Sequence, residues 1–318
     1  MASPDLTQLT AERSDTIFKE IILPAFIKTE LGKPISQSPE AIVLGGQPGS
    51  GKTGLLEESA VALKTKGATW VINGDDFYAF HPGYSKLQQK HGAEAANMVK
   101  AEASIWVKKT IEAAKDRGVN IVLESTMRRS ELVKTTLENL KKSGYKIHAK
   151  VLAVKEHISW QGNHMRHEAL SLTGAYSRLT SREIHDSAVL GVVKTLAMIE
   201  QKRLADRITV HQQNGKIIFD SREHQQEKQR SRTPGADALV KARERPWTSV
   251  EIIQHTKNWQ TVEALAAKRH ERENVTSKRV GAEMAAIRTQ RNLDAINLTA
   301  SRAPAALERT SRSQDKER

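Results

Sequence analysis

The stretch Ala41–Thr53, AIVLGGQPGSGKT, decides how the chain is organised. The apolar run 41–44 predicts a short buried strand, and a helix is expected to begin at Lys52 and Thr53. Between them the spacing is G-x-x-x-x-G-K-T, in which glycines let the backbone turn tightly and direct its N–H groups at a phosphate. The helix adds its positive amino-terminal end. The pattern therefore predicts a P-loop that binds a nucleoside triphosphate.

The P-loop pattern assigns a role to its individual side chains. Lys52 is expected to reach the β- and γ-phosphates, and the Thr53 hydroxyl is expected to ligate Mg²⁺. The expected ATP-binding residues are Gly46, Gln47, Pro48, Gly49, Ser50, Gly51, Lys52, Thr53 and Gly54.

The composition of the 318-residue chain narrows the class of protein. Cysteine is absent, which excludes a disulfide framework and a thiolate metal site. No leader pattern and no apolar run near the roughly 18 residues of a membrane span is present, so we expect a cytoplasmic protein without a membrane partner. The net charge of +13 indicates an anionic partner, but with only 4% aromatic residues nucleic acid is not favoured.

Apolar runs typical of strands alternate with helical patterns after the P-loop. This alternation predicts an α/β fold with a mostly parallel, doubly wound sheet flanked by helices. An Asn214-Gly215 pair predicts a hairpin between the last two expected strands. Strands are expected at 41–44, 68–73, 119–123, 146–154, 207–210 and 216–219. Helices are expected at 52–66, 93–116, 130–142, 157–167 and 181–205, the second of them burying Ile105, Val107, Ile111 and Ala114.

Two flanking regions differ from this α/β core. Residues 1–36 are expected to form an amphipathic helix, kinked at Pro24, and a linker. The kinase-like domain is assigned to 37–222, and 223–318 to a basic helical extension that holds about half of the excess positive charge. A solvated extension is the simplest expectation; docking an anionic partner, contacting nucleic acid and covering the core are the alternatives. Within it, helices are expected at 250–272 and 277–298, and a disordered tail at 301–318.

Acidic residues follow two of the expected strands, at the edge where ligands bind in open α/β sheets. A kinase for an alcohol needs a carboxylate that takes the hydroxyl proton, and Asp75 fits that role better than Asp76. The alternative for both is a helix cap or an acid near Mg²⁺. Glu124 is expected either near Mg²⁺ or as a substrate-binding carboxylate.

Three arginines surround the polar segment 170–180, which we expect to be a lid. Arg166, Arg178 and Arg182 can each donate paired hydrogen bonds to a phosphate when a lid closes. Plain surface arginine is the alternative, and which pair contacts ATP stays open.

Several motifs follow one another along residues 8–219. They are Gly51-Lys52-Thr53, Gly74-Asp75-Asp76-Phe77, His81-Pro82-Gly83-Tyr84, the set Glu124, Thr126 and Arg128, then Gly144-Tyr145, and Arg178 seven residues before His185-Asp186. In this order they resemble the zeta-toxin family of P-loop kinases, the toxic half of epsilon/zeta toxin–antitoxin systems.

The resemblance implies a kinase that uses ATP and Mg²⁺ to phosphorylate the 3′-hydroxyl of the amino sugar in UDP-N-acetylglucosamine or a related nucleotide sugar. Such a product blocks cell-wall synthesis. The resemblance also implies an antitoxin partner that inserts near the nucleotide site. By the same analogy Asp75 is the base, Thr53 serves Mg²⁺, and the phosphates are held by Lys52, Arg166 and Arg178. The sugar nucleotide is faced by Asp75, Glu124, Thr126 and Arg128.

Two other functions stay open at this point. A nucleoside or polynucleotide kinase would use its basic tail on phosphodiester backbones and prefer nucleic-acid ends as acceptors. A non-catalytic protein that binds ATP and nucleic acid would show salt-sensitive binding that survives Asp75→Ala, without any phosphorylated product.

Overall fold

The protein is built on one six-stranded sheet with the strand order β2-β3-β1-β4-β5-β6. The computed structural model describes residues 7–173, 179–223, 232–273 and 277–300. Neighbouring strands are parallel except for the β5–β6 hairpin, which confirms the predicted mostly parallel α/β sheet. The strands are β1 Glu40–Gly45, β2 Thr69–Ile72, β3 Asn120–Glu124, β4 Lys146–Leu152, β5 Arg207–His211 and β6 Ile217–Asp220.

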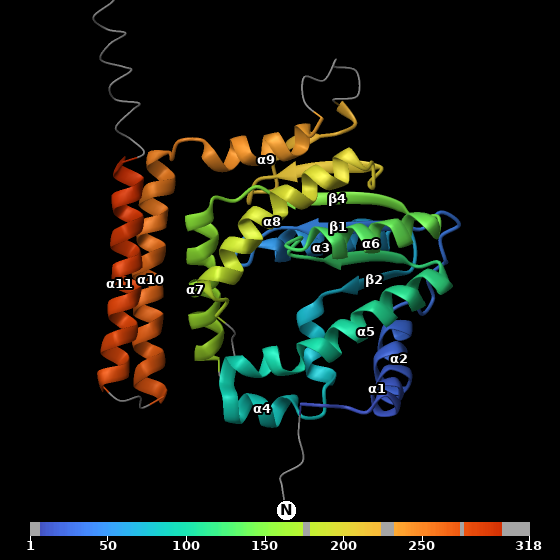
Figure 1. The fold of residues 1–318 in the computed structure, drawn as a ribbon, viewed down its shortest axis with the longest axis horizontal. Helices are drawn as coiled ribbons and strands as arrows, with labels where there is room; N and C mark the ends of the chain where they lie inside the picture. Colours follow the sequence, from blue (N-terminus) through green and yellow to red (C-terminus); the bar gives the residue numbers. More distant parts are fainter. Residues whose placement is uncertain (1–6, 174–178, 224–231, 274–276, 301–318) are drawn as a thin grey trace, which may run out of the picture.

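Helices flank this sheet and continue beyond it (Figure 1). Those before β4 are α1 Ala11–Ile17, α2 Leu23–Lys28, α3 Lys52–Lys64, α4 Tyr84–His91, α5 Ala95–Arg117 and α6 Ser130–Lys142. Those after β4 are α7 Glu156–Leu172, α8 Arg182–Gln201, α9 Pro234–Glu244, α10 Ser249–Glu273 and α11 Ser277–Ala300. No helix within the described ranges is long and apolar enough to cross a membrane.

The central strand β1 shows how the sheet separates two apolar layers. Ala41 and Val43 join a core cluster with residues of α5, α6 and α8, whereas Ile42 and Leu44 join a second cluster beneath α3. Successive side chains of a strand point to opposite faces, so one short apolar run serves both layers. A strand buried on both faces is therefore nearly all apolar, as this one is.

The buried face of α5 differs from the predicted one. Ile105 is 44% exposed, whereas its neighbour Trp106 is fully buried and donates from Nε1 to the backbone oxygen of Ser14, 3.2 Å away. Ile111 and Ala114 are buried as predicted. The expectation for Ile105 is wrong because the large indole ring of Trp106 sets the rotation of the helix toward the core.

The amino-terminal helical region changes its winding ahead of Pro24, the residue at which a kink was predicted. A π-helical turn, Phe18–Ile22, separates α1 from α2. Proline has no N–H to donate to the preceding turn, and Pro24 lies in the first turn of α2, where that loss is tolerated.

The carboxyl-terminal region packs on the core through α7 (Figure 1). Trp259, Val262 and Ala266 of α10 are fully buried, and they form an apolar cluster with Trp160 of α7 and Ile287 of α11. The two predicted helices of this region are present, but α9 was not predicted. The expectation of a purely solvated extension is wrong for the face of α10 that contacts α7. The predicted disordered tail, 301–318, lies outside the described residues.

Candidate active site

The P-loop joins the end of β1 to the start of α3 in the conformation that its glycines require. Gly49 and Gly51 have φ angles of +76° and +82°, in the left-handed region that other residues rarely adopt. A Cβ atom on Gly49 would lie 2.0 Å from the backbone oxygen of Ser159, so α7 packs directly against the loop. On the other side of the loop, nothing lies within 4 Å of a Cβ placed on Gly54.

Lys52 is the buried cation of the site. Only 7% of it is exposed, and its Nζ donates to the backbone oxygens of Gly46 at 2.9 Å and Gln47 at 3.3 Å. The same atom lies 3.7 Å from Oε1 of Glu124, at the end of β3. Burial lowers the pKa of Lys52, Arg166 lowers it further, and Glu124 and Asp75 oppose the change. Residues from three separate elements thus exert an electrostatic influence on one ammonium group.

Asp75 and Asp76 lie in the 3-10 segment Gly74–Phe80, directly after β2. Asn73 accepts from the backbone N–H of Asp75 at 3.2 Å and donates from its side chain to Oδ1 of Asp76 at 3.1 Å. Both aspartates are exposed, but the Asp76 carboxylate is already engaged by Asn73. Burial, and then Asp75, raise the pKa of Asp76. The segment therefore leaves Asp75 as the more open of the two carboxylates.

The loop after β3 is tightly held beneath the site. Met127 has a φ of +48°, is fully buried, and has its backbone oxygen bonded by the hydroxyl of Thr195 at 2.6 Å. Its side chain fills the space that a Cβ on Gly45 would occupy. Because Met127 points into the core, Thr126 before it is exposed and Arg128 after it is half-buried.

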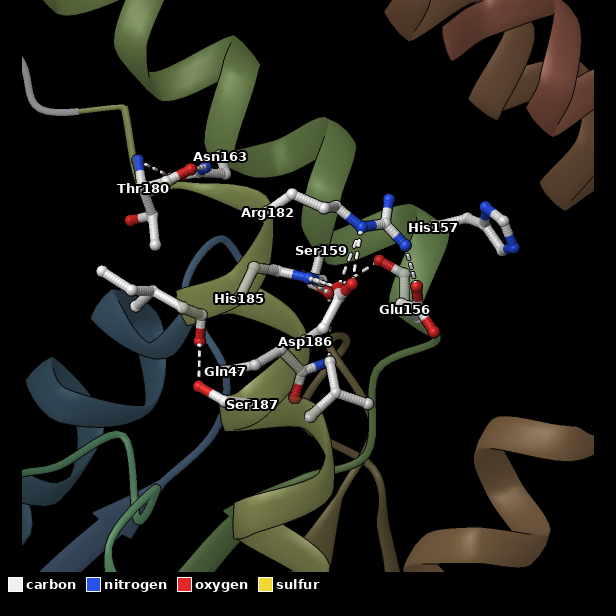
Figure 2. Close-up of polar contacts among 12 residues, drawn as sticks. Gln47, Glu156, His157, Ser159, Asn163, Thr180, Arg182, His185, Asp186 and Ser187 are labelled. Atoms are coloured by element: carbon white, nitrogen blue, oxygen red, sulfur yellow. Dashed lines mark hydrogen bonds and ion pairs between the residues drawn. The ribbon is translucent and has the colours of Figure 1, made fainter.

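The three arginines considered for the lid have different surroundings. Arg166 is exposed on α7 and acts electrostatically on Lys52. Arg182 forms ion pairs with Glu156 and Asp186 (Figure 2). Its guanidinium also lies 5.2 Å from the ring centre of Trp160. Arg178 lies outside the described residues. The helix α7 continues to Leu172, so the first residues of the segment predicted to be a lid are helical, and 174–178 lie outside the described residues.

A buried hydrogen-bond chain ties the P-loop to α8 (Figure 2). The amide of Gln47 donates to Ser159 Oγ at 3.1 Å, Ser159 lies 2.9 Å from His185 Nε2, and His185 Nδ1 lies 3.0 Å from Asp186. Burial lowers the pKa of His185, and its hydrogen bond with Asp186 opposes this change. The Ser159 hydroxyl also donates to the backbone oxygen of Glu156 at 2.9 Å. Ser159 and His185 are fully buried, which closes this serine–histidine–aspartate set to substrates and gives it a structural role.

The hydrogen-bond donors and the hydroxyl group at the carboxyl edge of the sheet can accommodate ATP and Mg²⁺. The P-loop backbone, Lys52 and the start of α3 suit a triphosphate, and the exposed Thr53 hydroxyl suits an oxygen-seeking cation. No cluster of three or more histidines, cysteines or carboxylates that could hold a metal is found in the described ranges. A bound Mg²⁺ would therefore take few ligands from these residues, with phosphate and water oxygens completing its shell.

Sequence reasoning missed the supports of the site. The side-chain anchor of Gln47, Ser159 on α7, and Arg243, which reaches Gln47 from α9, were not singled out as partners. Among the partners of Gln47 in the hydrogen-bond chain of Figure 2, only His185 and Asp186 were named from the sequence, because they stand at the end of a motif.

Comparison with known proteins identifies relatives for most of the chain. The family model described as zeta toxin matches residues 27–224. Toxin PezT of Streptococcus pneumoniae serotype 4 is 29% identical over 239 residues, which cover 75% of this chain and 91% of PezT. Toxin zeta of Enterococcus hirae is 31% identical over 193 residues, which cover 60% of this chain and 67% of that toxin.

Solved structures agree with these sequence matches. A chain from the PezAT chromosomal toxin–antitoxin system of Streptococcus pneumoniae superposes with a TM-score of 0.69 at 26% identity, covering 83% of this chain and 99% of that chain. A chain of the AvrRxo1-ORF1:-ORF2 complex, at 15% identity and a TM-score of 0.52, covers 89% and 90% and shares the fold.

Proposed function

Because this chain belongs to the zeta toxin family, we propose that it is an ATP-dependent kinase with an alcohol group as acceptor. The observation that supports this proposal most is that several charged side chains lie at the same edge of the sheet. Lys52 lies 3.7 Å from Glu124 and within electrostatic reach of Asp75 and Arg166. A site that combines a buried lysine, an open carboxylate and an open arginine has the parts that phosphoryl transfer needs.

In this proposal the phosphates bind along the P-loop. The backbone N–H groups of 46–54, apart from Pro48, which has none, and the Lys52 ammonium hold the triphosphate, and the Thr53 hydroxyl holds Mg²⁺. Bound Mg²⁺ supplies neutralisation of phosphate charge. Arg166 and Arg178 add donors on the lid side, whereas Arg182 is already paired with Glu156 and Asp186.

Asp75 is the proposed base. Its carboxylate is exposed and makes no hydrogen bond to another residue in the part of the chain that the structure describes. An acceptor hydroxyl placed there can donate its proton to Asp75 as the oxygen attacks the phosphorus atom. The nearby Asp76 is less suited, because Asn73 already occupies its carboxylate.

The proposed acceptor is the 3′-hydroxyl of the amino sugar of UDP-N-acetylglucosamine or a related nucleotide sugar, as the family resemblance implies. Glu124, Thr126 and Arg128 then contact the sugar nucleotide beside Asp75. The exposure of Thr126 and partial exposure of Glu124 and Arg128 support this assignment. An antitoxin protein is the proposed partner, by analogy with the PezAT toxin–antitoxin system.

A mass-spectrometric kinase assay tests the proposal. The purified protein, ATP and Mg²⁺ are mixed with UDP-sugars, nucleosides and 5′-hydroxyl oligonucleotides, in parallel with Asp75→Ala and the matched control Asp76→Ala. We expect a mass gain of one phosphate on a UDP-amino sugar, lost in Asp75→Ala and retained in Asp76→Ala. Phosphate on the oligonucleotides alone would identify a polynucleotide kinase. ATP binding without any modified acceptor in the panel would contradict the proposed acceptor class.

A further inference from the structure

Arg243, at the end of α9, contacts the P-loop residue Gln47. Its Nη2 atom donates to Oε1 of Gln47 at 2.6 Å, and its Nη1 atom donates to the backbone oxygen of Val189 in α8 at 2.8 Å. One side chain therefore joins the carboxyl-terminal region, the P-loop and α8. The family match ends at residue 224, so Arg243 lies in the part of the chain beyond it.

Gln47 is fully buried and is anchored from several directions at once. Its Nε2 donates to the backbone oxygen of Val154 at 2.8 Å and to Ser159 Oγ at 3.1 Å, while Arg243 donates to its Oε1. The backbone oxygen of Gln47 in turn lies 3.3 Å from Nζ of Lys52. Fixing this side chain fixes the backbone of the loop that Lys52 contacts.

The guanidinium of Arg243 is affected by an acidic group, Glu156, which opposes the effect of burial on its pKa. No ion pair to Arg243 is found among the described residues, and its buried Nε atom has no hydrogen-bond partner there. Burial lowers the pKa of Arg243 to about 10, so the guanidinium stays protonated at neutral pH. Removing this cation from water without a directly paired counter-charge is unfavourable, and a triphosphate on the adjoining P-loop would supply further negative charge.

The end of α9 is itself held in place. Lys155, which precedes α7, donates from Nζ to the backbone oxygen of Arg243 at 3.0 Å and also bonds the backbone oxygen of Arg245. Lys155 is buried, and its ammonium lies 5.5 Å from the ring centre of Trp247. The guanidinium of Arg243 is therefore carried on a backbone that the core fixes, which suits a positioning role.

We propose that Arg243 is a positioning residue of the nucleotide site, which holds the P-loop through Gln47 and favours a bound triphosphate by its charge. The inference rests on the proposed binding of ATP. It makes the carboxyl-terminal region a part of the nucleotide site without direct contact with the substrate.

Calorimetric titration of the full-length protein with ATP and with AMP tests the role. In Arg243→Ala we expect the Kd of ATP to rise about tenfold, the scale of one lost charge-assisted hydrogen bond. The Kd of AMP should change less, because AMP lacks the β- and γ-phosphates. Arg243→Lys, which keeps the charge but cannot bridge Gln47 and Val189, should fall between. Lys241→Ala, an exposed cation of the same helix, is the matched control and should bind like wild type.

A coupling measurement separates positioning from a general loss of stability. Gln47→Ala and Arg243→Ala should be strongly non-additive in ATP affinity, since each removes the same contact. Equal weakening of ATP and AMP, or additive effects, would overturn the inference, as would wild-type ATP affinity in a folded Arg243→Ala protein. If the wild-type protein binds no ATP, the proposed function fails first, so the two failures are distinguishable. If Arg243→Ala does not fold, Arg243→Lys carries the same comparison.

Discussion

The carboxyl edge of the sheet and the interface of α7 with α10 and α11 use charged residues in opposite ways. At the sheet edge, Asp75 and Arg166 are exposed, and neither forms an ion pair with another described residue. In α11, Asp294 is fully buried. It accepts hydrogen bonds from four side chains, which are His157, His255, Trp259 and Gln290. The first region keeps its charges available for a ligand, and the second uses them to join helices.

This difference changes how the basic composition of the chain is understood. Arg269 of α10 is buried against Glu168 of α7 and also contacts Glu283 of α11. Arg245 pairs with Glu251, and Arg243 bonds Gln47. Part of the positive charge that indicated an anionic partner therefore serves contacts within the chain. Whether a charged side chain is available to a ligand or joins helices depends on its burial, which cannot be read from the sequence.

The largest expected effect tests the open carboxylate at the sheet edge. Asp75→Asn should lower kcat by about 10³-fold, because a base positioned on the attacking hydroxyl is lost. Its melting temperature should stay near that of wild type, since the side chain is exposed. Initial rates of phosphoryl transfer and thermal unfolding measure the two properties. Asp76→Asn is the control, and equal losses in both variants would contradict the distinction between these neighbours.

The second effect tests the buried carboxylate. Asp294→Ala should lower the free energy of unfolding by about 3 kcal/mol, because it leaves buried donors without an acceptor. Urea unfolding at neutral pH measures the change. Glu271→Ala, an exposed acid on α10, should stay within about 0.5 kcal/mol of wild type. A similar stability for both variants would show that Asp294 does not hold the helices together.

The third effect compares two arginines near the lid. Arg166→Ala should lower kcat by about 10²-fold with little change in stability, because its guanidinium is open to the phosphates. Arg182→Ala should have little effect on kcat. It should lower the free energy of unfolding by up to about 1 kcal/mol, because it breaks the ion pairs with Glu156 and Asp186. Steady-state kinetics and urea unfolding of both variants check this. A larger kinetic loss in Arg182→Ala would contradict the assignment.

The smallest effect is a pH dependence at the interface. The hydrogen bond to Asp294, with help from Glu156, raises the pKa of His157, and burial and Arg182 oppose the change. The stabilisation is therefore complete below the unfolded pKa of about 6.5 and is lost as the pH rises through the higher folded pKa. The free energy of unfolding should fall over that range more in wild type than in His157→Gln. Parallel pH profiles would contradict this.

The features predicted correctly from the sequence are those that depend on residues adjacent along the chain. The P-loop, the alternation of strands and helices, and the hairpin at Asn214-Gly215 all follow from short contiguous patterns, and the structure has each of them. In the predicted buried face of α5, Ile105 was wrong, because periodicity alone did not weigh Trp106 against Ile105. The helix α9 was missed because it is short and carries no regular apolar stripe.

The supports of the site could not be predicted in the same way. Gln47 and Arg243 are 196 residues apart, and no local pattern links an arginine of α9 to a loop after β1. Ser159 likewise supports the P-loop only because α7 packs on Gly49. The role of Asp75 is a prediction that the kinetic variants above test, and the roles of Glu124, Thr126 and Arg128 stay predictions.

The contact between Gln47 and Arg243 also has a consequence for the time course of synthesis. The P-loop leaves the ribosome early, but the residue that anchors it follows 196 positions later. At about 5 to 20 residues per second, that delay is about 10 to 40 s. A nascent or truncated chain would then carry a complete phosphate-binding motif without one of its anchors. If Arg243 positions the P-loop as proposed, full nucleotide affinity would be reached only after residue 243 has been made.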